Sequence, residues 1–79
     1  MTIEFTTKQG QYLAFIYYYT KLNGEPPAHM DFIRYFQVTP PTVNDMLKRL
    51  ESKGLIERQP RTARAIELLV DVEELPELE

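Results

Sequence analysis

Basic side chains are concentrated in one stretch of this 79-residue chain. Residues 34–64 hold seven lysines and arginines against three acids, a local charge of +4, although the whole chain carries −3. Five of the acids lie in the last ten residues, which contain no base. Such a division of charge is typical of a surface that meets phosphate groups, and a merely solvated basic face is the simpler alternative.

A helix with an outward polar face is expected within the same stretch. Thr39 is a good N-cap, and Pro40 follows at the first helical position, where its missing N–H costs nothing. The helix continues to about residue 53. Its inward side is predicted from apolar residues spaced i, i+3, i+4 and i+7, namely Val43, Met46, Leu47 and Leu50. The outward side then consists of Pro41, Thr42, Asn44, Asp45, Lys48 and Arg49.

These outward side chains suit the major groove of double-stranded DNA. Asn44 can pair with an adenine edge, and Thr42 can touch a thymine methyl. Lys48 and Arg49 can reach phosphate or guanine, and the helix start at Thr39 brings amides towards phosphate. Asp45 fits less well, because it either accepts from a cytosine amine or pairs with Arg49 one turn later.

Two further helices and a hairpin are expected around this one. Thr6 and Gln9 form a capping-box pattern that opens a helix, and Asn23-Gly24 ends it. A second helix is expected over 28–36 and a turn over 37–39. After Gly54, strands are expected over 55–58 and 64–70. We therefore predict a mainly α winged helix-turn-helix domain over 1–69, a three-helix bundle with a two-stranded antiparallel wing, and an acidic tail over 70–79.

The connection between the two strands is polar and basic. Three arginines lie in or beside it, Arg58, Arg61 and Arg64, and we expect them to meet the flanking DNA backbone or the minor groove. With Thr39 and the outward side of the preceding helix, they complete the predicted DNA-binding set.

The stretch from Phe5 to Leu69 resembles the amino-terminal DNA-binding domain of LexA repressors. The parallels are Phe5-Thr6-Thr7-Lys8-Gln9, Gly24-Glu25-Pro26-Pro27, Thr39-Pro40, Leu47-Lys48-Arg49-Leu50, Lys53-Gly54-Leu55-Ile56-Glu57 and Ile66-Glu67-Leu68-Leu69. The third helix and wing start are also similar to MarR-type winged helices. The resemblance implies a small repressor-like regulator that binds specific DNA sequences. Pro41, Asn44 and Asp45 differ from the LexA residues, so the LexA operator does not carry over.

Other classes of function find little support in the sequence. LexA-type repressors carry a self-cleaving protease and dimerisation domain, for which 79 residues leave no room. The sequence also contains no motif that pairs a nucleophile with a base, so we expect no enzyme. The chain has no cysteine and one histidine, His29, so we expect no metal, cofactor or small-molecule site. No signal or membrane-spanning run is evident, and we expect a cytoplasmic protein.

The main alternative is a winged helix used for protein–protein contact, which the sequence pI of about 5.1 and Asp45 favour. A steep loss of binding with rising salt distinguishes DNA from a protein partner, because phosphate contacts release counterions.

The last expectation concerns the oligomeric state of the chain. One helix reads only a few base pairs, so we expect a homodimer. Tyr17 and Tyr18 either cover the tail or form a dimer face. The tail is expected to be frayed and solubilising, or else to dock a second subunit through its apolar residues Val70, Val72, Leu75 and Leu78.

Overall fold

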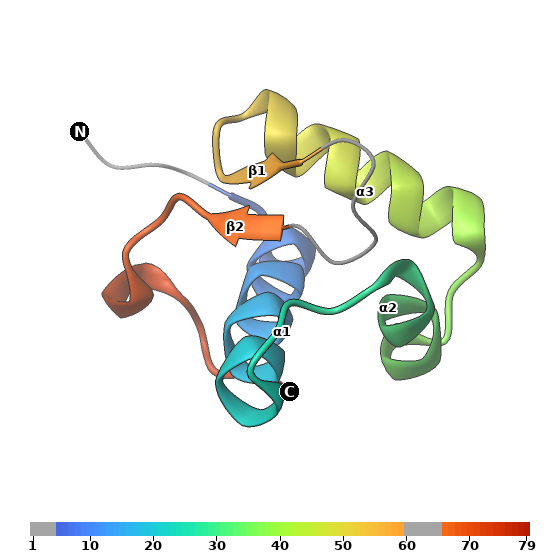
Figure 1. Cartoon of the computed structure of the whole chain (residues 1–79). Coiled ribbons are helices and arrows are strands. Elements are labelled where there is room, and N and C mark those ends of the chain that lie inside the picture. Colours follow the sequence, from blue (N-terminus) through green and yellow to red (C-terminus); the bar gives the residue numbers. More distant parts are fainter. Residues whose placement is uncertain (1–4, 60–65) are drawn as a thin grey trace.

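Three α-helices and a two-stranded hairpin follow one another along the part of the chain that the structure describes (Figure 1). A computed structural model describes residues 5–59 and 66–79. The helices are α1 (Thr7–Asn23), α2 (His29–Phe36) and α3 (Pro40–Ser52), the strands are β1 (Ile56–Arg58) and β2 (Ile66–Leu68), and a short 3₁₀ helix, η1 (Val72–Glu74), follows. This order confirms the predicted winged helix-turn-helix architecture, with helix bounds within one or two residues of those expected.

Helix α1 has the ends that its sequence predicts. The Thr6 hydroxyl accepts from the Gln9 amide at 3.1 Å, and the Thr6 amide donates to Gln9 Oε1 at 2.9 Å, so the capping box is formed. Gly24 ends the helix in the left-handed region at φ 77°, where its N–H donates to the Thr20 carbonyl.

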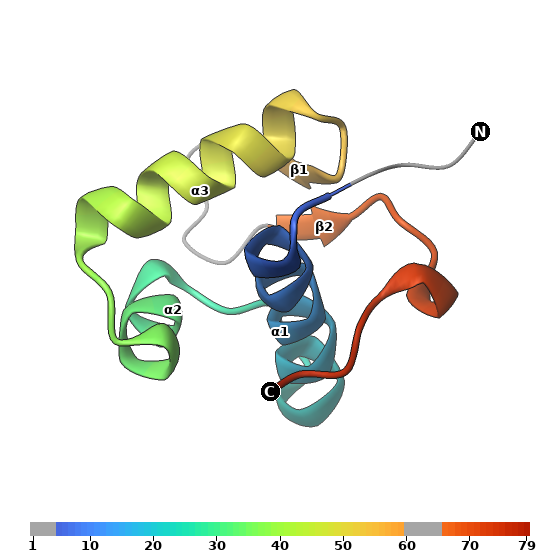
Figure 2. The same ribbon diagram turned by 180° about the vertical axis from the view of Figure 1, so that it is seen from behind.

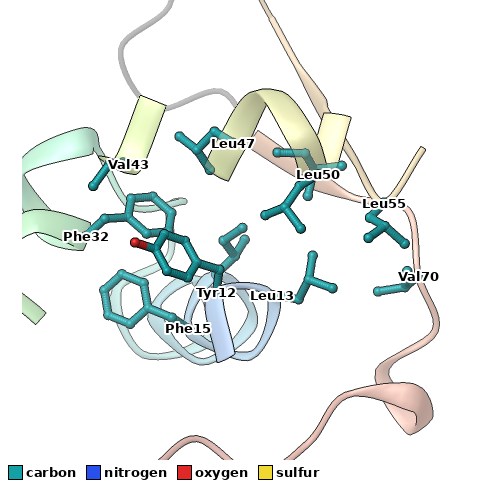
Figure 3. Close-up of a cluster of buried hydrophobic side chains, with 11 residues drawn as sticks. Tyr12, Leu13, Phe15, Phe32, Val43, Leu47, Leu50, Leu55 and Val70 are labelled. Carbon is teal, nitrogen blue, oxygen red and sulfur yellow. The ribbon is translucent and has the colours of Figure 1, made fainter. Parts of the chain in front are cut away.

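The inward faces of the helices meet in one core (Figure 3). The Tyr12 ring stacks on Phe32 and on Phe36, with ring centroids 5.5 Å and 4.2 Å apart, and burial raises the pKa of its phenol. From α3, Leu47 and its neighbours along the inward stripe, Val43 and Leu50, are fully buried as predicted, whereas Met46 is only partly buried.

Among the described residues the strands are shorter than expected, because Leu55, Leu69 and Val70 lie outside them. β1 and β2 are antiparallel, with Ile56 opposite Leu68 and Arg58 opposite Ile66. A further bond from the Leu69 amide to the Leu55 carbonyl, 2.9 Å long, continues the pairing beyond the strands. Leu55 and Ile56 are fully buried, so the start of the hairpin is anchored in the core.

The tail over 70–79, called the C-terminal strap from here on, is not frayed, so that expectation was wrong. The strap leaves β2, forms η1 and returns to α1 (Figures 1 and 2). Gln11 Nε2 donates to the Glu77 carbonyl at 2.9 Å, and Gln11 Oε1 accepts from the Glu79 amide at 2.8 Å. The Tyr35 hydroxyl donates to the Glu79 carbonyl, which ties the strap to α2.

The apolar residues of the strap serve the chain's own core. Val70 is buried, and Leu75 and Leu78 are half-buried against the core cluster. They are therefore not free for a second subunit, which corrects that part of the dimer expectation. Val72, about half exposed, is the apolar residue of the strap that remains on the surface.

Candidate nucleic-acid interface

The turn between α2 and α3 sets the direction of the third helix. Gln37 ends α2 in the left-handed region, with φ 55° and ψ 52°, and is the one non-glycine residue with positive φ among those described. The left-handed conformation costs a residue with a side chain about 1–2 kcal/mol of conformational energy, so packing must hold the turn in place. Phe36 and Val38 on either side of it are packed against the core.

The outward face of α3 lies opposite its buried stripe, as predicted. Asn44 is half-buried, and five other residues of the predicted set are exposed: Pro41, Thr42, Asp45, Lys48 and Arg49. The same helix therefore carries amide, hydroxyl and cationic groups on a face that solvent reaches.

The start of α3 gathers hydrogen-bonding groups. Thr39 is the N-cap, but its hydroxyl meets the Thr42 hydroxyl at 2.8 Å and bonds no backbone amide. Because Pro40 and Pro41 have no N–H, the first amide of the helix belongs to Thr42. One amide and two hydroxyls thus lie at the positive end of the helix dipole, an arrangement that suits an anion.

The contacts of the charged side chains determine which cations near α3 remain exposed without a partner. Asp45 and Arg49, both of them described, form no ion pair, so the i, i+4 pair that was one of the two alternatives for Asp45 is absent. Lys53 Nζ donates to Gln9 Oε1 at 3.0 Å, which holds its ammonium against α1. Lys48 and Arg49 therefore remain as the exposed cations of the outward face.

Arg58, expected to meet the flanking DNA backbone or the minor groove, forms an ion pair with Glu51, Nη2 to Oε1 3.2 Å. Sequence reasoning gave no role to Glu51, because the pair depends on how the hairpin lies against α3. Arg61 and Arg64 lie outside the described residues. The described residues contain no group of three histidines or acids placed to hold a metal ion, and no described helix has the length and apolar character needed to cross a membrane.

Two helices joined by a tight turn, the second with a polar outward face, and a hairpin after them define a winged helix-turn-helix domain. A sequence model of the LexA DNA-binding domain matches residues 2–65. The chain belongs to the LexA DNA-binding domain family.

Several LexA repressors are similar to the chain. That of Thermosipho africanus is 36% identical over 66 residues, 84% of this chain and 33% of the relative. That of Clostridium perfringens strain SM101 is 39% identical over 67 residues, again 84% and 33%. That of Carboxydothermus hydrogenoformans is 37% identical over 65 residues, 81% and 32%. The chain thus spans about a third of the length of the curated relatives it matches.

Proposed function

We propose that the chain binds double-stranded DNA through α3 and acts as a repressor of transcription. The observation that carries the proposal is the outward face of α3, where exposed Lys48 and Arg49 lie on the same helix as Thr42 and Asn44. The opposite face is locked into the core, so these groups are held on a rigid element. A major groove admits one helix presented in this way.

Each group on this face has a separate role in the proposal. The Thr42 amide, with the hydroxyls of Thr39 and Thr42, receives a phosphate at the helix start. Asn44 reads a base edge, and Lys48 and Arg49 bind phosphate or guanine. Pro41 and Asp45 border the base-reading surface, and Arg61 and Arg64 of the wing are assigned to the flanking backbone from the sequence alone.

Salt dependence tests the proposal. The association constant of the parent chain for a duplex selected from a random pool is expected to fall steeply with salt. Lys48→Gln should reduce the slope of log K against log salt by about 0.9, since one phosphate contact is lost. Asn44→Ala should instead reduce the discrimination between the selected duplex and a scrambled one, by about 1–3 kcal/mol. Fluorescence anisotropy over a salt series measures both quantities.

Lys21→Gln is the matched control for Lys48→Gln. Lys21 lies in the last turn of α1, at the bottom of both views, whereas α3 lies at the top (Figures 1 and 2). Removing this cation should leave the slope unchanged. Equal slopes for the parent and Lys48→Gln would contradict the placement of α3 on DNA. Failure of the parent to bind duplex in a salt-dependent way would favour a protein partner.

We infer further that two copies bind DNA together. One recognition helix distinguishes too few base pairs for a unique site, and helix-turn-helix proteins meet this need with paired half-sites. The second half of α1 supports such an interface, because Tyr18 is 37% exposed and Leu22 is 83% exposed. Beside them, Tyr17 lines an apolar groove of about 310 Å³ between α1 and β2.

Tyr18→Glu tests the α1 interface. Sedimentation of the parent with the selected duplex is expected to give two chains per duplex, and Tyr18→Glu should give one. Val72→Glu tests separately whether the exposed part of the strap takes part. A parent that remains monomeric with and without DNA would overturn the dimer.

A further inference from the structure

Arg58 and Glu51 connect the end of β1 to the last turn of α3. Arg58 Nη2 and Nε lie 3.2 Å and 3.4 Å from the same carboxylate oxygen, Glu51 Oε1. The Arg58 and Glu51 side chains are 24% and 43% exposed, so the pair lies at the surface with the Arg58 side chain mostly covered.

Strand periodicity directs Arg58 towards the helix. Side chains alternate between the two faces of a strand. Ile56 is buried, Glu57 is exposed and Arg58 is half-buried, so Arg58 shares the inner face of the hairpin with Ile56. Its guanidinium is therefore directed to α3 by the same alternation that buries Ile56, and away from the outer face, on which Glu57 lies.

The two ends of β1 are held by different means. At its beginning, Leu55 is fully buried, and its amide donates to the Leu50 carbonyl at 2.9 Å. At its other end, the bond to Glu51 joins the strand to α3 through side chains. The connection between the strands follows directly beyond that end. A small rotation of β1 about its buried beginning would therefore move Arg58 and its partner Ile66, at the far end of the paired strands, relative to α3.

We propose that Arg58 is a positioning residue, which fixes the direction of the hairpin relative to α3 through Glu51 and binds no phosphate itself. The inference rests on the proposed DNA binding and replaces the sequence-based assignment of Arg58 to the backbone. A phosphate would have to compete with a carboxylate already 3.2 Å from the guanidinium, and would also be repelled by that carboxylate.

Three variants test the role of the pair: Arg58→Gln, Glu51→Gln, and the exchange in which Glu51→Arg is combined with Arg58→Glu. Binding of the duplex selected by the parent chain is measured by anisotropy over a salt series. Each single variant should weaken binding by about two- to fivefold at every salt concentration, the range expected for a surface ion pair. The slope of log K against log salt should not change, and the exchange should restore most of the lost affinity.

A phosphate contact predicts a different pattern. Arg58→Gln would then lower the slope by about 0.9, and Glu51→Gln would strengthen binding, because a repelling carboxylate is removed. The exchange would then bind worse than either single variant. Any of these three results would overturn the positioning role. Lys48→Gln serves as the control that does lower the slope.

The proposed function and the pair fail in different ways. Without salt-dependent binding of the parent, the proposed function fails and the role of Arg58 fails with it. If the parent does bind in a salt-dependent way, the direction in which Glu51→Gln changes the affinity tests the positioning role separately from the proposed function. Circular dichroism melts should show all variants folded, since an exposed ion pair contributes little to stability.

Discussion

Replacing Leu47 with alanine is expected to lower the free energy of unfolding by about 2–5 kcal/mol, from lost transfer energy and the cavity left behind. Leu47 is fully buried and projects from the middle of α3 into the core (Figure 3). In a chain of 79 residues the core is small, so one cavity removes a large part of the total stability. Urea denaturation followed by circular dichroism measures the change.

Leu22→Ala is the matched control, because the same side chain is removed from a position that is 83% exposed. Its effect should stay within about 0.5 kcal/mol. Coincident denaturation curves for the parent and Leu47→Ala would mean that α3 does not face the core as described.

The helices could be predicted because their signals are local. The capping box joins Thr6 and Gln9 within one turn, and the bonds at 3.1 Å and 2.9 Å are those that its pattern implies. The facing of α3 follows from a period of 3.6 residues, which the positions of Val43, Leu47 and Leu50 already contain. Such features require no knowledge of the rest of the fold.

The side-chain pairs around the site could not be predicted in the same way. Lys53 meets Gln9 across 44 positions of sequence, and Arg58 meets Glu51 only because the hairpin folds back on α3. The i, i+4 pair of Asp45 with Arg49, which local spacing favoured, does not form. The alternation of β1 was the one available signal for Arg58, since it placed this side chain on the inner face with Ile56.

The attachment of the strap to α1 could not be predicted from the sequence, for a related reason. Its composition, five acids in ten residues, is typical of a solvated tail. Its attachment instead depends on backbone groups that sequence does not display, the Glu77 carbonyl and the Glu79 amide, which meet one side chain more than sixty positions away, Gln11. The acids themselves stay exposed, so the composition correctly predicts the solvent-facing side of the strap. It does not predict the side that packs against the rest of the domain.

Ending the chain after Leu69 is therefore expected to destabilise the domain by about 3–5 kcal/mol, the value for one buried and two half-buried aliphatic side chains together with lost hydrogen bonds. Val70, Leu75 and Leu78 supply the apolar contacts, and Gln11, only 8% exposed, loses both of its partners on the strap. Thermal denaturation of the shortened and full chains measures the difference.

Two variants of the full chain distinguish the contribution of packing to the stability from that of charge. Replacing the five acids of the strap with their amides should leave the melting temperature nearly unchanged, because all five side chains are exposed. Gly10→Ala should lower it, because crowding of the new Cβ, 2.8 Å from Phe5 Cε1 and 3.0 Å from Pro76 Cγ, should outweigh the gain of about 1 kcal/mol in helix propensity. If the shortened chain melts with the full one, the strap adds no stability. If it melts lower, as expected, truncation is unsuited to testing dimerisation, and single changes at Tyr18 and Val72 are required for that purpose.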